Sequence, residues 1–423
     1  MGIEGPARIE GPARIVVRDV AIIDATGREP EGRHDVLVED GRIRSIGSSG
    51  HLPADVATID GAGCTLLPGL TDAHVHFALI GQQGDHGSDP WIMHVLAVSQ
   101  VIEAALQEGF TTVRDAGGLE PTWAQAVASG TLRGPRILPS GSPISQTGGH
   151  ADDRARHEAI HAGVTIPGLV AGMLVADGAD EVRRAAREQL RRGATQIKLM
   201  ASGGIISPTD PFDSLQLSVA EIAAAVEVAR SWGTYVMAHC HTTPAVEMAL
   251  EAGVRSIEHG SLLAPETAAR MAAAGAFMVP TLQAMEFFLA HRDLLDVPAE
   301  KVALAEDVAV RAYQSIAIAR DAGVKLGSGS DVVGPWQGRR GEELVYKARV
   351  LGAHGAIISA TRVNAELFGL DAEIGTIEVG KQADLLLLAG QPLDDIALLA
   401  EPDNVTLVMR AGVVARDREG RLA

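Results

Sequence analysis

The feature that most limits the fold of this chain is a regular alternation of short apolar segments with amphipathic segments between residues 68 and 370. Eight apolar segments have the length of buried β-strands, and the segments between them carry helix start and stop signals. One helix is predicted from Ile222 to Trp232, because Ser218 and Glu221 form a capping box before it and Gly233 follows it. The predicted strands lie within residues 66–76, 111–115, 135–139, 195–200, 234–239, 256–259, 276–280 and 324–328.

Eight strands that alternate with helices over residues 68–370 predict an α/β fold, a (β/α)8 TIM barrel with long loops. A doubly wound open sheet is the alternative architecture. It is disfavoured because no Gly-x-Gly-x-x-Gly fingerprint follows the first strand. The longest connection runs from Gln146 to about Ala179, and a loop of this length predicts a functional or mobile segment.

The two ends of the chain have a different pattern, made of short strands and turns. Residues 36–43 alternate in polarity, and the Asp40-Gly41 pair predicts a tight hairpin. Residues 383–388 and 405–414, near the C-terminus, show the same pattern of short strands and turns. We therefore predict a small β-sandwich domain built from residues 1–67 and 371–423, which would cover sheet edges that one end alone would expose.

Composition excludes several classes of partner. The chain has 36 basic and 54 acidic side chains and a net charge of −18, which argues against nucleic acid or an anionic membrane. Only Cys64 and Cys240 occur among 423 residues, and so low a count favours a reducing, cytoplasmic compartment. We expect neither a secretory signal nor a membrane span, since no apolar run of about 18 residues is present.

The first predicted strand ends in two histidines that are separated by one residue. If the strand continues through them, alternation places His74 and His76 on one face and Val75 on the other. Two imidazoles on one face at the end of a buried strand can hold one metal ion. A His-x-His pair taken alone is more often a chance pair in a surface segment, so the interpretation depends on the other strand ends.

In a barrel, the C-terminal ends of all strands converge on one mouth. Lys198 is the unusual member of the polar set found there, because an ammonium group beside metal ions would be repelled. The carbamate that its amine forms with carbon dioxide is anionic and has two oxygens that could bridge two cations. The candidate metal ligands at the strand ends are His74, His76, Lys198, His239, His259 and Asp331.

This set resembles the binuclear form of the amidohydrolase superfamily. Residues 68–76 are similar to the opening motif of that family, and residues 364–369 and 375–385 resemble its last helix and the return into the β-domain. Within the superfamily, Thr147-Gly148-Gly149-His150 and His239-Cys240-His241 resemble the imidazolonepropionase-like and Xaa-Pro dipeptidase-like group. The resemblance covers nearly the whole chain, and six ligands in the family's order make it specific.

The resemblance implies two divalent metal ions, with zinc expected and manganese or cobalt as alternatives. It implies that the carbamylated Lys198 bridges the two ions and that Asp331 also acts as the general base. The first ion would be held by His74, His76 and Asp331, and the second by His239 and His259.

The same resemblance implies that His150 and His241 face the substrate, where they would bind a carboxylate or stabilise an oxyanion. Support of neighbouring ligands is an equally open interpretation of both residues. Spacing does not decide which of His239 and His241 is the ligand, because alternation lets both face the mouth, and the family position favours His239.

Among members of the family, the chain most resembles the ochratoxin-hydrolysing amidohydrolases. This implies cleavage of an amide next to a C-terminal amino acid, as in the conversion of ochratoxin A to ochratoxin alpha and phenylalanine, or in dipeptides and N-acyl amino acids. It also implies a homo-oligomer that acts on a small molecule. Apolar residues after the seventh and eighth strands would either line an aromatic pocket or pack in the core, and these are Leu282, Met285, Phe287, Phe288 and Trp336.

Two alternatives belong to other functional classes. A mononuclear deaminase or imidazolone-type cyclic amide hydrolase on the same fold usually lacks the fourth-strand lysine and carries an acid soon after the fifth-strand histidine. Here no acid follows His239 before Glu247. A non-enzymatic protein on the same barrel would require ligands to be missing, and all six are present.

Overall fold

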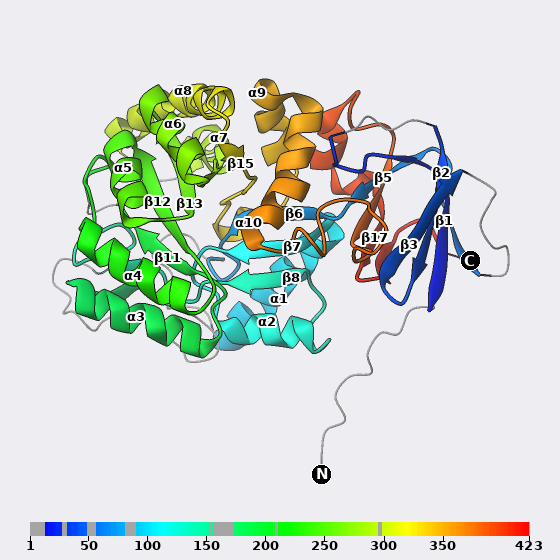
Figure 1. Cartoon of the computed structure of the whole chain (residues 1–423), viewed down its shortest axis with the longest axis horizontal. Helices are drawn as coiled ribbons and strands as arrows, with labels where there is room; N and C mark the ends of the chain where they lie inside the picture. The colour runs from blue at the N-terminus through cyan, green and yellow to red at the C-terminus, as the bar shows by residue number, and fades with distance from the viewer. Residues whose placement is uncertain are drawn as a thin grey trace, which may run out of the picture.

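The computed structural model describes residues 13–27, 32–48, 56–80, 90–152, 154, 172–205, 207, 210–294 and 298–422. Figure 1 shows a large α/β unit that carries most of the helices, beside a smaller unit made of strands from both ends of the chain. Most of residues 153–171, in the long connection predicted from Gln146 to Ala179, lies outside the described residues.

The α/β unit contains strands near all eight predicted positions, so the predicted α/β class is confirmed. These strands are β6 (Leu70–Val75), β7 (Phe110–Asp115), β8 (Arg136–Pro139), β11 (Ile197–Met200), β12 (Val236–Thr242), β13 (Ser256–Leu262), β14 (Phe277–Val279) and β15 (Lys325–Leu326). Two short strands, β9 (Ile144–Ser145) and β10 (Leu174–Val175), lie in the long connection. Every pairing between these strands is parallel.

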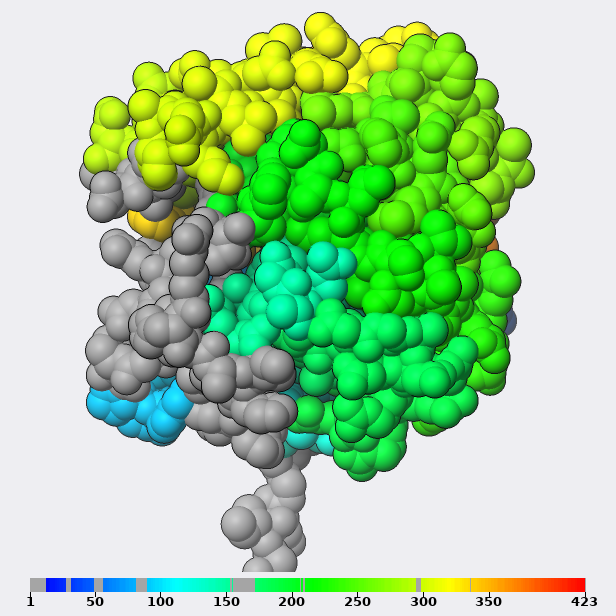
Figure 2. Space-filling view, turned by 90° about the vertical axis from the view of Figure 1, so that its left-hand side faces the viewer, coloured from blue at the N-terminus to red at the C-terminus, as the bar shows by residue number. Residues whose placement is uncertain are grey.

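Helices separate most of these strands. Outside its grey atoms, the face shown in Figure 2 is formed largely by the green to yellow part of the chain, which contains α3 to α8. The helices are α1 (Trp91–Gln107), α2 (Pro121–Ala128), α3 (Ala179–Arg192), α4 (Val219–Ser231), α5 (Thr243–Ala252), α6 (Pro265–Ala274), α7 (Leu282–Ala290), α8 (Ala299–Asp321), α9 (Glu342–Ile358) and α10 (Asn364–Phe368). Short helical turns occur at η1 (Arg292–Leu294), η2 (Gly334–Trp336), η3 (Ser359–Val363), η4 (Ile396–Ala400) and η5 (Pro402–Asn404).

The predicted capping box is confirmed at the start of α4. The Ser218 hydroxyl accepts from the Glu221 amide, and the Glu221 carboxylate accepts from the Ser218 amide at 2.6 Å. Two otherwise unsatisfied backbone donors are thereby paired, which explains why the helix begins here. The helix starts at Val219, a few residues before the predicted start at Ile222, because the first turn follows the cap directly.

Strand pairing divides the α/β unit into two ladders, β10-β9-β11-β12-β13-β14-β15 and β6-β7-β8. Two gaps separate the ends of these ladders, and backbone hydrogen bonds cross both, from Ala73 N to Ser328 O at 2.8 Å and from Thr195 N to Pro139 O at 2.8 Å. Side-chain amides add further hydrogen bonds across each gap. Gln196 donates to Leu138 O at 3.0 Å across one gap, and Asn364 donates to Ser328 O at 2.9 Å and to Thr71 O at 3.1 Å across the other.

The two ends of the chain form one connected sheet in the order β18-β17-β16-β5-β1-β2-β3, with β4 paired to β1. Its strands are β1 (Arg14–Ile22), β2 (His34–Glu39), β3 (Arg42–Ser48), β4 (Ala57–Asp60), β5 (Cys64–Pro68), β16 (Leu385–Ala389), β17 (Val405–Arg410) and β18 (Val413–Asp417). The predicted Asp40-Gly41 hairpin is confirmed. Both residues have positive φ, +50° and +77°, between the paired residues Glu39 and Arg42.

Alternation along β16 decides which core each residue joins. Leu385 and Leu387 pack with apolar residues of β1, β2 and β5, whereas Leu386 and Leu388 pack with residues of α1 and β7. One face of β16 therefore belongs to the core of the β-rich unit, and the other joins that unit to the helices and strands of the α/β unit.

The stretch from Leu66 to His76 contains parts of two strands, which are separated at the Pro68-Gly69 break. β5 ends at Pro68 and pairs with β16, whereas β6 begins at Leu70 and pairs with β7. Proline offers no backbone donor, and the Gly69 amide is used by Asp384 O at 2.8 Å. A Cβ at position 69 would lie 2.2 Å from the Thr111 side chain, so the crossing between the two sheets requires glycine.

Candidate metal centre and active site

The predicted site residues meet at one end of the strands in the α/β unit. His239 and His241 lie on β12, His259 lies on β13, and Asp331 follows β15. His74 lies on β6, and His76 follows its last residue. Two groups have ligand atoms within 4.8 Å of one another, and these groups are His74, His76 and Asp331, and His239, His241 and His259. Each could hold a metal ion.

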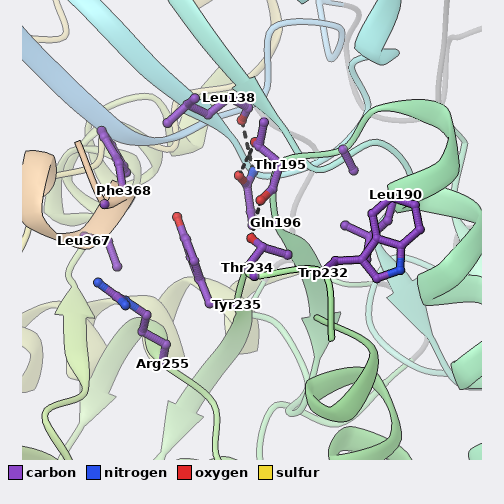
Figure 3. Close-up of a pocket in the computed structure, with 13 residues that line it drawn as sticks. Leu138, Leu190, Thr195, Gln196, Trp232, Thr234, Tyr235, Arg255, Leu367 and Phe368 are labelled. Atoms are coloured by element: carbon purple, nitrogen blue, oxygen red, sulfur yellow. Dashed lines mark hydrogen bonds between the residues drawn. The ribbon is translucent and has the colours of Figure 1, made fainter. Parts of the chain in front are cut away.

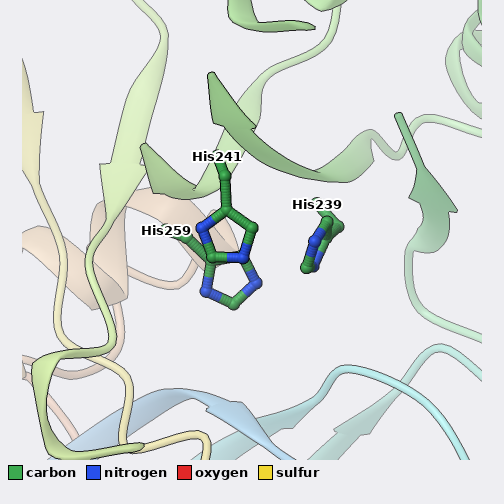
Figure 4. Close-up of side chains that lie close together, drawn as sticks. All are labelled: His239, His241 and His259. Atoms are coloured by element: carbon green, nitrogen blue, oxygen red, sulfur yellow. The ribbon is translucent and has the colours of Figure 1, made fainter. Parts of the chain in front are cut away.

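The two groups are adjacent. The ring centroids of His74 and His259 lie 5.1 Å apart, and His259 Nδ1 lies 3.8 Å from Asp331 Oδ2. Figure 4 shows the imidazoles of His239, His241 and His259 turned toward one another from β12 and β13. The structure therefore brings all four predicted imidazole ligands and the carboxylate together, and it adds His241 to the same cluster.

Two of these residues have backbone conformations that L-residues rarely adopt. His259 has φ of +70° and Asp331 has φ of +54°. Such conformations cost about 1–3 kcal/mol each and persist only where the surrounding structure holds them. The Asp331 amide is held by His74 O at 2.8 Å, and His259 Nδ1 lies 2.7 Å from the Thr281 hydroxyl. These backbone conformations direct both side chains into the cluster.

Hydrogen bonds fix the orientation of the imidazole rings. His76 Nδ1 donates to Gly117 O at 2.9 Å, and His74 Nδ1 donates to Glu258 Oε2 at 2.7 Å. A carbonyl or carboxylate can only accept, so each of these two rings has its Nε2 lone pair free when it is neutral. His241 Nδ1 lies 3.0 Å from the Ser261 hydroxyl, which can donate or accept, so Nε2 of His241 can carry either the lone pair or the proton. Metal-ligating histidines typically have one ring nitrogen anchored like this.

Burial and the Asp331 carboxylate shift the pKa values of these histidines in opposite directions. Burial lowers the pKa of His74 to about 4 and that of His241 to about 3, so both are neutral imidazoles at pH 7. Burial opposes ionisation of Asp331, but the charges of His74 and the hydrogen bond from His76 hold its pKa well below the usual range. Burial likewise lowers the pKa of His76, but Asp331 outweighs it and raises that pKa overall.

Lys198 is a buried side chain on β11 whose charged form the site disfavours. Burial lowers the pKa of its amine, and among the described residues the amine makes no hydrogen bond and no ion pair. A buried amine without a partner is costly, so a chemical partner is expected there. Neutral imidazoles, one carboxylate and one unpaired amine together fit a divalent-metal site with a carbamylated lysine.

The sequence analysis missed a buried carboxylate that contacts this site, Glu258. Both of its oxygens accept from Arg114, at 2.8 and 3.0 Å, and one accepts from His74. Arg114 also donates to Ala73 O at 2.7 Å, and both charged residues have 0% exposure. Burial opposes ionisation of Glu258, but Arg114 and His74 lower its pKa to about 2. The sequence contained one signal for this ion pair: Arg114 and Glu258 are charged residues within two segments that were predicted to be buried strands.

His150 lies beside this cluster but belongs to neither group that could hold a metal. Its ring centroid is 4.3 Å from that of His239, and its buried Nδ1 has no hydrogen-bond partner among the described residues. Burial lowers the pKa of His150 to about 4. A Cβ at Gly204 would lie 2.1 Å from the His150 ring, so glycine makes room for it. A neutral, incompletely bonded imidazole here can bind a polar group of a substrate.

The residues predicted to line an aromatic pocket divide into two sets. Leu282 and Phe288 are buried in hydrophobic cores, so they pack. Phe287 stacks on His291 with a centroid distance of 3.9 Å and contacts Trp336 at 5.3 Å. The aromatic ring that contacts the metal-site histidines was not predicted. It is Phe212, 5.2 Å from His241.

A pocket of about 380 Å³ lies at the opposite ends of the same strands (Figure 3). Thr195, Thr234 and Arg255 line it just before β11, β12 and β13 begin. The polar groups there bond within the protein, since Thr195 donates to Gln196 and Arg255 donates to Glu366 O. None of the candidate catalytic residues lines this pocket, which lies at the N-terminal ends of the strands.

The chain belongs to the amidohydrolase family, whose model matches residues 65–415. It is 32% identical to the ochratoxinase of Aspergillus niger over 426 residues, which cover 95% of this chain and 86% of that protein. It is therefore a hydrolase that acts on C–N bonds, in a family whose substrates are small molecules and whose members generally use metal ions.

Two crystal structures show the same fold at similar identity. A prolidase complexed with N-methylphosphonate-L-proline is 38% identical, with a TM-score of 0.89 and coverage of 96% of this chain and 100% of that chain. A Xaa-Pro dipeptidase with bound methionine is 31% identical, with a TM-score of 0.85 and coverage of 95% and 99%. Among the helices that the structure describes, none has the length and apolar character needed to cross a membrane.

Proposed function

We propose that the enzyme is a binuclear metal-dependent amidohydrolase that cleaves an amide next to a C-terminal amino acid. The observation that carries the proposal is the position of the unpaired, buried Lys198 amine among the candidate ligand groups. Lys198 contributes electrostatically to the pKa of His74, His239 and His259, so it lies near both groups. A mononuclear site has no use for a bridging group at this position.

In this proposal the residues divide between two ions, which we expect to be zinc. Lys198, as its carbamate, would be a ligand to both ions, and His241 would stay free for the substrate. His74, His76 and Asp331 would hold the first ion, and His239 and His259 would hold the second. When bound, the ions polarise the scissile carbonyl and make water a nucleophile at neutral pH.

Asp331 is the proposed general base. Its carboxylate lies 3.3 Å from His76 Nε2 and 3.5 Å from His74 Nε2, at the centre of the first group. From there it takes a proton from the attacking water and passes it to the leaving nitrogen. His241 and His150 are proposed to stabilise the oxyanion and to bind the carboxylate of the leaving amino acid, since both are neutral donors beside His239.

The proposed substrates are ochratoxin A, cleaved to ochratoxin alpha and phenylalanine, and related dipeptides or N-acyl amino acids. The names of the relatives support amide cleavage beside a terminal amino acid, because they include an ochratoxinase, a prolidase and a Xaa-Pro dipeptidase. Phe212 against His241 supports an apolar group on one side of the scissile amide. We also propose that the enzyme acts as a homo-oligomer.

We further propose that the two parallel ladders close into one (β/α)8 barrel over residues 68–370. The hydrogen bonds from Ala73 and Thr195 and the amides of Gln196 and Asn364 support closure at both gaps. Residues 1–67 and 371–423 are proposed to form the β-sandwich. Support comes from the apolar core that strands of both ends share.

The test is metal content per chain, measured on the same sample as hydrolysis of ochratoxin A and a panel of Xaa-Phe and Xaa-Pro dipeptides. Two ions per chain with amide cleavage are expected. One ion per chain, with ammonia released from a ring substrate, would instead assign the protein to the mononuclear deaminases.

The two histidines of β12 are predicted to respond differently to substitution. His241→Ala should keep two ions per chain and lower kcat by ~10²- to 10³-fold, as loss of an oxyanion donor does. His239→Ala should lose one ion. Metal analysis and steady-state kinetics on both variants decide the assignment, which is reversed if His241→Ala empties a site and His239→Ala does not.

A further inference from the structure

Side chains as well as backbone hydrogen bonds hold the main chain around His74 and His76, where the strand pairing is irregular. The pairing of β6 with β7 is irregular between Asp72 and Val75, and β15 on the other side has only two residues. The Ala73 carbonyl accepts from Arg114, and the His76 carbonyl accepts from Gln337 at 2.8 Å. Buried backbone groups must be paired, so these side chains supplement the backbone hydrogen bonds of Ala73 to Ser328 and of Asp331 to His74.

Asp115, at the end of β7, holds His76 in two ways. Its Oδ2 accepts from the amide of Phe77, the residue directly after His76, at 3.0 Å. Its Oδ1 accepts from the amide of Gly117 at 2.9 Å, and the carbonyl of Gly117 accepts from His76 Nδ1. Asp115 has 0% exposure, so water does not compete for these bonds. The same carboxylate fixes both the main chain of His76 and the group that orients its ring.

We propose that Asp115 is a positioning residue for the metal centre, which sets the place and the tautomer of His76 before a metal ion binds. The inference rests on the proposed role of His76 as a metal ligand. Asp115 belongs to neither group of candidate ligands, so its expected effect on metal affinity acts through His76. Partners of this kind typically contribute ~10- to 100-fold to metal affinity.

Asp72 provides a matched control, because it is also buried and also accepts backbone hydrogen bonds beside a candidate ligand. Its Oδ1 accepts from the amides of His74 and Ser330, both at 3.0 Å, and its Oδ2 accepts from the Ser330 hydroxyl at 2.6 Å. Asn at position 72 can keep all three bonds, since its oxygen serves both amides and its NH₂ donates to the hydroxyl.

Asn at position 115 cannot do the same. The partners of the Asp115 carboxylate are all backbone N–H groups, of Phe77 at Oδ2 and of Gly117 and Leu119 at Oδ1, and these cannot accept a hydrogen bond. In either orientation, the amide NH₂ therefore faces a backbone N–H group. The hydrogen bond to Phe77 or the hydrogen bond to Gly117 is then lost, and with it one of the two contacts that hold His76. Asp115→Asn and Asp72→Asn thus make the same chemical change with different consequences for the ligands.

The experiment measures zinc affinity by chelator competition on wild type, Asp115→Asn and Asp72→Asn, with thermal midpoints of the metal-free proteins as the measure of folding. Asp115→Asn should bind one ion ~10- to 100-fold more weakly. Asp72→Asn should bind both ions as wild type does. Equal losses in the two variants, or no loss in Asp115→Asn, would overturn the inference. Two ions per wild-type chain test the proposed function separately.

A measurement on the wild-type protein covers the case in which Asp115→Asn fails to fold. In metal-free enzyme at alkaline pH, nitrogen-15 NMR should show His76 as the Nδ1–H tautomer, with the amides of Phe77 and Gly117 protected from exchange. A mixed tautomer, or amides that become protected only after zinc is added, would mean that the metal and not Asp115 organises this segment.

Discussion

Lys198→Ala should remove metal and activity together. We expect fewer than one ion per chain and a loss of kcat/KM greater than the ~10- to 100-fold caused by losing a supporting partner. The physical reason is that the bridging carbamate cannot form without the amine, and no other described anion lies ready to replace it, since Glu258 is already paired with Arg114 and His74. Metal analysis and hydrolysis of an amide substrate measure both losses.

Two controls separate this chemistry from loss of packing. Lys198→Met fills most of the buried volume without an amine, so it should recover stability and still lose metal. Added short carboxylic acids should restore part of the metal content and activity of Lys198→Ala, because a carboxylate can take the place of the carbamate. A Lys198→Met enzyme with two ions and normal turnover would remove the lysine from the metal centre.

Asp331→Asn should lower kcat by at least the ~10²- to 10⁴-fold that general acid–base catalysis supplies, while the fold stays intact. Asn is the appropriate substitution because the residue has φ of +54°, a conformation that Asn adopts readily and Ala does not. The backbone bond from position 331 to His74 O is also kept. Only the proton-accepting carboxylate is lost.

The measurement is single-turnover hydrolysis at saturating zinc, with circular dichroism to confirm folding. Saturating metal matters because Asp331 is also a proposed ligand, and Asn binds metal more weakly than a carboxylate. Substantial turnover in a fully metal-loaded Asp331→Asn enzyme would show that another group takes the proton.

The sequence could predict the strands because each is a short apolar segment with glycine, proline or a polar cluster at its ends. The candidate ligands followed from the strands, since strand ends in a parallel sheet meet at one edge. The Pro68-Gly69 break between β5 and β6 was visible in the sequence. The pairing partners of the two strands, β16 and β7, were not, because both strands are buried and apolar.

The supporting residues could not be predicted for a different reason. The contact between His74 and Glu258 joins positions 184 residues apart, and Asp115 acts through the amides of Phe77 and Gly117. Such contacts depend on how the strands close around the site and on local backbone turns. Neither hydrophobic periodicity nor motif spacing contains that information.

The crossing at Gly69 has a mechanical consequence for the enzyme. One residue separates the strand that pairs with β16 from the strand that carries His74, and Leu67, Leu386 and Val408 share a core with helix α1 and strand β7. The β-rich unit therefore has no flexible tether around which to swing, and any displacement of it would shift the histidine strand. Conformational changes during turnover must then be confined to the connections at the C-terminal ends of the strands.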